Sequence, residues 1–118
     1  MAIASEIIGK LGGADVEVIP VEGEVSGSKG SKKVLATIDV PAGETWLVAA
    51  IGQTTAASSV ASQYQPMLYL GNEISSGRSS DGMHGLATTA TESISLSIRR
   101  NYSSGTDSFT GHVYTVKM

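Results

Sequence analysis

Few side chains in this sequence combine a reactive type with a spacing that catalysis or metal binding requires. His84 and His112 are the only two histidines, and Asp81 lies three residues before His84 in the stretch DGMH. Such a pair can share a metal ion, but protein metal sites take three or more ligands, and no third ligand follows at a recognisable spacing. A solvated loop explains the pair more simply. We therefore predict neither a metal ion nor a cofactor.

The patterns of known catalytic sites are also missing. The sequence contains no G-x-S-x-G nucleophile elbow, no phosphate-binding glycine loop, no dinucleotide-binding fingerprint and no HExxH zinc motif. Its 17 serines are so many that a serine–histidine–acid triad cannot be inferred from their positions. Glu73, Asp81 and Asp107 could supply a carboxylate pair, yet solvated loop acids are far commoner. We predict that the protein is not an enzyme.

The charge of the chain argues against nucleic acid and membrane as partners. Eight basic and eleven acidic residues give a formal net charge of -3 at pH 7. The basic blocks are only the pairs Lys32-Lys33 and Arg99-Arg100, whereas binding to a phosphate backbone needs several clustered cations. No apolar run approaches the roughly 20 residues that span a bilayer, and the first residues lack a signal-peptide pattern. We expect a soluble, unprocessed protein.

The elements that must position any site are expected to be strands. Charged residues make up 16% of the chain, and serine, threonine and glycine are abundant, which disfavours long helices. In KVLATIDV, the alternation predicts a strand with Val34, Ala36, Ile38 and Val40 on its buried face. The following Pro41-Ala42-Gly43 is typical of a tight reversal between antiparallel strands, with the proline at the second turn position.

The strand after this corner is apolar on both faces. Trp46, Val48 and Ala50 form the expected inward row, and Trp46 is predicted to be buried in the core. Leu47, Ala49 and Ile51 form the opposite row, which one thin sandwich cannot cover as well. We therefore predict that Leu47, Ala49 and Ile51 lie in an oligomer interface, most simply that of a homotrimer.

The remaining segments complete an all-β architecture. Residues 71–85 are rich in glycine and serine and are expected to form a loop. TESISLSIRRN and FTGHVYTVKM are expected strands, and in the first of them Ile94, Leu96 and Ile98 are predicted to face inward. Six or so strands with turns between them predict an antiparallel β-sandwich, jelly-roll-like, over residues 15–118.

A short arm is expected to precede this domain, over residues 1–14. Its apolar residues Ile7, Ile8 and Leu11 are too few to hold a helix alone, and Gly12-Gly13 separates them from the sandwich. We predict that Ile7, Ile8 and Leu11 anchor the protein to a neighbouring subunit or to a particle surface. The alternative is that the arm covers one end of its own core.

The corner VPAGETW, the Gly/Ser-rich loops and the closing stretches SISLSIRRNYSSGTDS and FTGHVYTVKM resemble small β-sandwich proteins of tailed-bacteriophage virions. These are head decoration (cement) proteins and fibre or spike domains, and the resemblance covers residues 33–118 in style. It implies a trimeric structural protein of the virion, assembled in the host cytoplasm. The implied partner is the major capsid protein or another virion protein, and no active site is implied.

A receptor- or glycan-binding module of a fibre or spike is the alternative function. It would use the 71–85 segment together with exposed aromatic side chains as stacking platforms. The candidate platforms are the four tyrosines, Tyr64, Tyr69, Tyr102 and Tyr114. Sugar binding by such a module would be tested directly with a glycan array.

Overall fold

The computed structural model describes residues 16–55, 66–75, 83–101 and 105–118, and they form eight β-strands. The strands are β1 (Val16–Gly27), β2 (Lys32–Ile38), β3 (Trp46–Thr55), β4 (Met67–Leu70), β5 (Glu73–Ser75), β6 (Met83–Ala90), β7 (Ile94–Arg99) and β8 (Gly105–Lys117). Among these residues there is no helix of a length and hydrophobicity that would cross a membrane. The predicted all-β class is confirmed.

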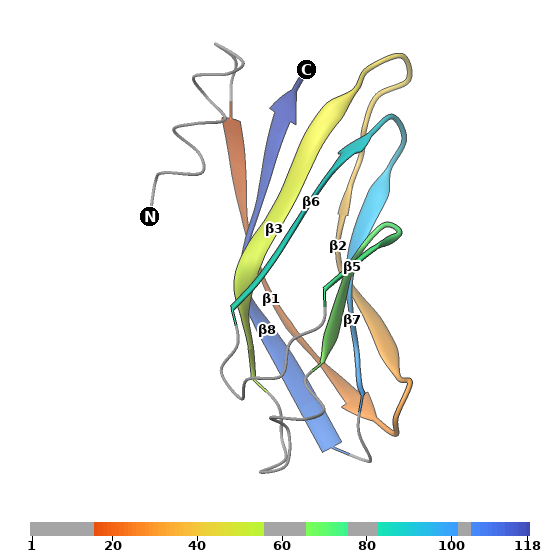
Figure 1. The fold of residues 1–118 in the computed structure, drawn as a ribbon, viewed down its shortest axis with the longest axis vertical. Helices are drawn as coiled ribbons and strands as arrows, with labels where there is room; N and C mark the ends of the chain where they lie inside the picture. The colour runs from red at the N-terminus through yellow and green to blue at the C-terminus, as the bar shows by residue number, and fades with distance from the viewer. Residues whose placement is uncertain (1–15, 56–65, 76–82, 102–104) are drawn as a thin grey trace.

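The strands form two four-stranded antiparallel sheets that pack face to face (Figure 1). The order in the first, here called the β1 sheet, is β1-β8-β3-β6, and the order in the second, the β2 sheet, is β2-β7-β4-β5. The pairs β1·β8, β2·β7, β3·β6 and β4·β5 are those of one long hairpin, and successive pairs alternate between the sheets. A hairpin rolled up in this way is an eight-stranded jelly roll, which confirms the predicted sandwich.

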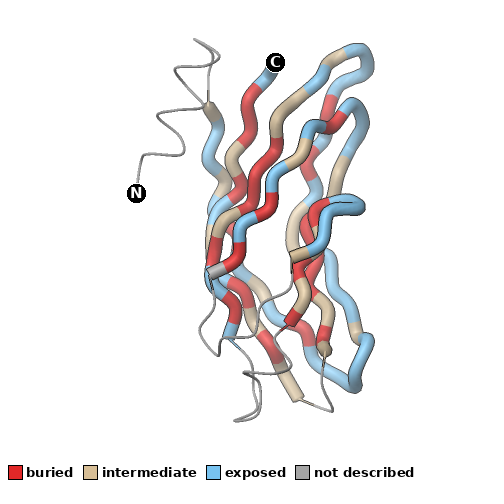
Figure 2. Tube along the Cα trace, viewed as in Figure 1, coloured by how far each residue is buried: buried red, intermediate tan, exposed pale blue. Residues whose placement is uncertain are grey.

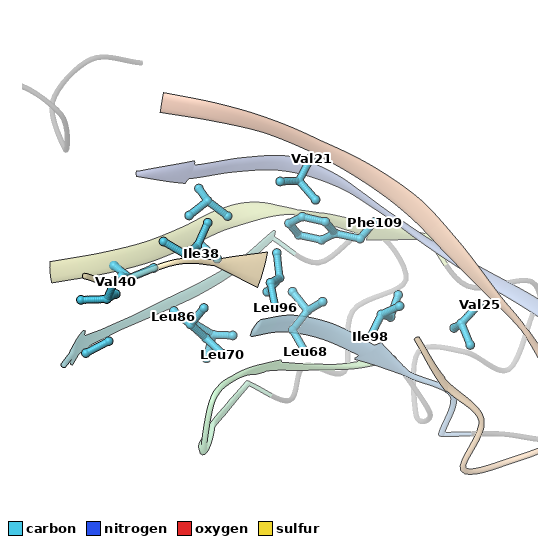
Figure 3. Packing of buried hydrophobic residues seen from close by; sticks show 14 residues of the cluster. Val21, Val25, Ile38, Val40, Leu68, Leu70, Leu86, Leu96, Ile98 and Phe109 are labelled. Carbon is cyan, nitrogen blue, oxygen red and sulfur yellow. The ribbon is translucent and has the colours of Figure 1, made fainter. Parts of the chain in front are cut away.

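The core lies between the sheets and is made by alternate residues of nearly every strand (Figure 3). Its fully enclosed side chains include Val48, Leu68, Leu96 and Phe109. Figure 2 shows the same alternation of buried and exposed residues along the chain. The prediction that the side chain of Leu96, in strand β7, points into the core is therefore confirmed.

Two glycines make room for the single phenylalanine of the chain. A Cβ atom on Gly52 would lie 2.5 Å from Cζ of Phe109, and a Cβ atom on Gly111 would lie 2.3 Å from the carbonyl oxygen of Ile51. Neither distance is sterically allowed. The close approach of β3 and β8 around the Phe109 ring therefore requires glycine at both positions.

The strand β2 departs from the alternation predicted for it. Val34 is 55% exposed rather than buried, whereas Leu35 and Ala36 both pack against the core. The register of β2 against β7 shifts between Val34 and Ala36, as it does at a β-bulge. The extra residue turns Val34 outward while Ile38 and Val40 stay buried as predicted.

The corner at Pro41 is a tight turn, but it does not join neighbouring strands. The amide of Glu44 donates to the carbonyl of Pro41 over 3.1 Å, so proline is the first turn residue and not the second. Gly43 has φ 82°, which favours glycine. Because β2 and β3 lie in different sheets, the turn leads from one layer to the other, and the predicted hairpin here is wrong.

Trp46 begins β3 next to this corner and is partly buried. Its ring packs against the core, and its indole nitrogen donates to Oε1 of Glu44 over 2.8 Å. Nζ of Lys117 lies 3.6 Å from the same carboxylate oxygen. Trp46 therefore closes the end of the core, as expected, but it is less enclosed than the sequence predicted.

The opposite end of the sandwich is held by a buried ion pair. Nη1 of Arg100 lies 2.9 Å from Oδ1 of Asp107, and both side chains are almost fully buried. Arg100 follows β7 and Asp107 lies in β8, so the pair joins the two sheets. The backbone of Arg100 also exchanges hydrogen bonds with Gly30 and Ser31 in the β1–β2 connection.

Candidate functional site

The outer side of the β1 sheet carries an apolar surface built by four strands. In an antiparallel sheet, directly opposed residues point to the same side. Leu47 lies opposite Val116, and Ala49 lies opposite both Tyr114 and Ala87. The surface, here called the apolar face, consists of Val16, Val18, Leu47, Ala49, Ile51, Ala87, Tyr114 and Val116.

The strand β3 creates this face because it is apolar at successive positions. Val48 and Ala50 belong to the core between the sheets, so Leu47, Ala49 and Ile51 point to the other side. Leu47 and Ile51 are half-buried, and Ala49 between them is buried. The three residues proposed for an oligomer interface thus lie together on one face of a central strand.

The flanking strands extend the face beyond what the sequence indicated. Val116 is buried, but it does not belong to the core cluster. It pairs with Leu47 and therefore points, like Leu47, to the outer side of the sheet. Val18, on the edge strand β1, is 45% exposed. Alternation alone could not find Val18 and Val116, since their place on the same face as the β3 residues depends on strand order and register.

The face is uneven in height. Its small side chains lie together, with Ala49 beside Ala87 and with Gly85 opposite Ile51, while the larger Leu47 and Ile51 lie on either side of Ala49 along β3. A Cβ atom on Gly85 would meet nothing within 4 Å, so the surface there is open. Along β8 stand the rings of His112 and Tyr114, whose centroids are 6.3 Å apart. Ala49, Gly85 and Ala87 therefore form a low apolar area, here called the trough, beside the ridge of His112 and Tyr114.

Charged residues begin only beyond this face. On the outer side of β1, Glu22 and Glu24 follow Pro20 towards the β1–β2 connection, and both are exposed. The apolar face itself contains no charged side chain. Its chemistry is therefore that of packing against another apolar surface.

The histidine considered for metal binding lies in a strand and not in a loop. His84 is in β6, is 4% exposed and faces the interior. Nε2 of its ring is 2.9 Å from Oγ1 of Thr54 in β3, and Nδ1 is hydrogen-bonded to Oγ of Ser75 in β5. Because β5 belongs to the other sheet, His84 links the two sheets at their adjacent edges. Its burial lowers its pKa below the usual value.

Ser75 and His84 resemble a nucleophile and its base, but the described part of the chain does not assemble the rest of a catalytic site around them. The second ring nitrogen meets a threonine hydroxyl and not the carboxylate that orients a catalytic histidine. Asp81 falls outside the described residues. Within the described ranges, no three metal-ligating side chains gather at one place. The arrangement suits a structural link between the sheets.

The predicted 71–85 loop is in part strand, since β5 and the start of β6 lie within it. A surface cleft of about 440 Å³ lies beside the β4–β5 turn and the β6–β7 turn. Its polar lining includes Asn72, Glu73, Glu92 and Ser93. No aromatic ring lines the cleft among the residues that the structure describes, so it offers no stacking platform for a sugar.

The other residues singled out in the sequence are distributed as follows. Tyr69 lies on the outer side of the β2 sheet, with Nζ of Lys32 4.4 Å from its ring centroid. Tyr114 lies on the apolar face. The proposed anchoring residues Ile7, Ile8 and Leu11, and also Tyr64 and Tyr102, lie outside the described residues.

Comparison with known proteins adds no relative. The chain matches no protein-family model and no curated protein.

Proposed function

We propose that this chain is a non-enzymatic structural subunit that self-associates through the apolar face and, as a trimer, decorates the capsid of a phage virion. The observation that carries the proposal is the position of Leu47, Ala49 and Ile51 on the outer side of a central strand. The apolar residues around them come from three other strands.

The energetic argument concerns the surface that one copy leaves in water. Val18 is 45% exposed, Ala87 is exposed, and Leu47 and Ile51 are half-buried, whereas Ala49 and Val116 are already buried in the single chain. Burying apolar surface contributes about 25 cal/mol per Å². A contiguous apolar face without charges is typical of a protein–protein contact rather than of a free surface.

The particle-bound role is supported by the fold and by the resemblance to phage decoration proteins. Jelly rolls form the domains of many viral capsid proteins, although the same architecture also serves lectins and enzymes. The self-association is proposed to be cyclic and trimeric, and the partner on the particle is the major capsid protein. This places the protein in the virion after assembly in the host cytoplasm.

Oligomeric state is the first test. Size-exclusion chromatography with light scattering should give three times the 12.1 kDa mass of one chain. Ile51→Glu and Leu47→Glu should dissociate the trimer, because each places a charge in an apolar contact. Ile74→Glu is the matched control: Ile74 is 53% exposed on the outer side of the other sheet, and the variant should remain trimeric. A fully assembled Ile51→Glu protein of unchanged stability would refute the interface.

Location on the particle is the second test. Antibodies against the chain should label capsids of intact phage particles produced by cells that express it, as seen by immunogold electron microscopy. Labelling confined to the tail would favour a fibre or spike. Particles without any label would refute a virion role.

The polar cleft beside Glu73 and Glu92 supports a second candidate, a receptor- or glycan-binding module. Its acids and hydroxyls could accept and donate hydrogen bonds to a sugar, although stacking would have to come from elsewhere. A glycan array should then show signals that Glu73→Ala together with Glu92→Ala removes. A glycan array without signals would refute glycan binding by this cleft.

A further inference from the structure

The chain enters the sandwich at the apolar face. Val16 is the first residue of β1, it pairs with Val116, and both side chains lie on the outer side of the sheet. Fifteen residues precede Val16, and among them are Ile3, Ile7, Ile8 and Leu11. An extended segment of this length reaches up to about 50 Å, at roughly 3.3 Å per residue. It can therefore cross a four-stranded sheet, whose strands lie about 4.8 Å apart.

The trough has the chemistry that such a segment would need. The small residues Ala49, Gly85 and Ala87 occupy two adjacent strands and are flanked by Leu47 and Ile51 along β3 and by the His112–Tyr114 ridge. On a helix, Ile7, Ile8 and Leu11 would share one side and could meet this apolar surface.

We infer that the trough over Ala49, Gly85 and Ala87 is the docking site for residues 3–11 of a neighbouring copy of the chain. This inference rests on the proposed self-association and names its partner. The predicted interface and the predicted anchoring arm are then the two halves of one contact. A segment that covered the face of its own subunit would instead leave no apolar face for assembly.

Such a contact is heterologous, because the arm of one copy meets the face of the next. Heterologous contacts close into a ring if the rotation between copies allows it. Gly12-Gly13, between the arm and β1, can adopt the backbone angles that closure requires. A closed trimer would use three identical arm–face contacts.

Complementation between two incomplete variants tests the inference. A variant with residues 2–12 deleted keeps the face but lacks the arm, and Gly85→Ile keeps the arm but fills the trough. Isoleucine suits a strand, and a Cβ atom at Gly85 meets nothing within 4 Å, so this variant should fold. Each variant alone should be monomeric by native mass spectrometry, and their mixture should give a one-to-one heterodimer. Ile74→Glu in either partner is the control and should not prevent that heterodimer.

A peptide experiment gives a second, independent result. A synthetic peptide of residues 1–14 should bind the deletion variant, as measured by calorimetry. Binding should weaken at least tenfold when Gly85→Ile is added, or when Ile7, Ile8 and Leu11 of the peptide are replaced by serine. No detectable binding of the unmodified peptide would overturn the inference.

The outcomes separate this inference from the proposed function. If the deletion variant still forms the wild-type trimer, the arm is not the occupant, although self-association stands. If the wild-type protein itself is a monomer, the proposed self-association fails before the arm is tested. If the deletion variant is monomeric and its mixture with Gly85→Ile gives no heterodimer, docking on a neighbouring copy is refuted.

Discussion

Replacing Asp107 by asparagine should destabilise the protein more than almost any other isosteric change. The carboxylate of Asp107 lies 2.9 Å from Nη1 of Arg100, and only 2–3% of each side chain is exposed. Asparagine keeps the shape but removes the negative charge that faces the buried guanidinium of Arg100 inside the sandwich. Breaking a buried pair in this way costs about 3–5 kcal/mol. A domain of this size has about 5–15 kcal/mol of stability in total, so the loss would be large.

The assay is guanidinium unfolding followed by the fluorescence of Trp46, the single tryptophan of the chain. Lys117→Met provides the control, because Lys117 forms the exposed ion pair with Glu44 at 3.6 Å. An exposed pair contributes about 0–1 kcal/mol, so this variant should unfold close to the wild type.

A double variant completes the test. Replacing Arg100 by methionine and Asp107 by leucine removes both charges and fills similar volume, and it should restore most of the stability lost in Asp107→Asn. The reasoning would be refuted if Asp107→Asn cost less than about 1 kcal/mol. It would also be refuted if the double variant were less stable than Asp107→Asn, because the loss would then not come from breaking the buried ion pair.

Three further predictions concern the core and its polar links. Trp46→Ala should lower the free energy of unfolding by about 2–3 kcal/mol, which is less than the 3–5 kcal/mol of a fully enclosed aromatic, because Trp46 is only partly buried. Urea unfolding followed by circular dichroism measures this loss, and a value under about 1 kcal/mol would show that the ring does not close the core. Gly52→Ala should cost about 1–3 kcal/mol through the clash with Phe109, and thermal unfolding that is unchanged would contradict the packing. Since burial lowers the pKa of His84 in the folded state, the unfolded chain takes up this proton first as pH falls. The stabilisation is therefore complete above the unfolded pKa of about 6.5 and declines as pH falls through it towards the folded pKa. His84→Gln should flatten the difference in unfolding free energy between pH 7.5 and 5.5, and an identical difference in the variant would exclude His84 as its source.

Alternation in the sequence was sufficient to predict which side chains face the core in strands that contain no bulge. Leu96 and Ile98 face inward as predicted because β7 is a regular central strand of its sheet. Val34 was misplaced because a bulge adds one residue to β2, and no local pattern distinguishes a bulged strand from a regular one. The corner at Pro41 was misread for a related reason: a tight turn between strands looks the same whether it stays in one sheet or crosses to the other.

The candidate site could be predicted only in part. Leu47, Ala49 and Ile51 were found because they alternate with core residues within one strand. Val116 and Ala87 could not be found, since they reach the same face only through strand order. The link from His84 to Ser75 was also missed, because it joins edge strands of two different sheets. The positions of Val116 and Ala87 depend on strands that pair over long distances in the chain. The link between Ser75 and His84, nine residues apart, depends on which sheet each strand joins, and single residues carry no signal about either.

The pairing of first strand with last has a consequence for the order in which the molecule forms. The β4–β5 pair closes over a two-residue turn, whereas β1 joins β8 across nearly the whole chain, with Val16 opposite Val116. Loop closure costs more entropy as the loop lengthens, and folding slows as contacts become less local. We therefore expect β1·β8 to be the last pair to form. Because this pair adds Val16 and Val18 to the apolar face, a nascent chain completes that face only at the end of folding, so the proposed self-association would follow the folding of the subunit.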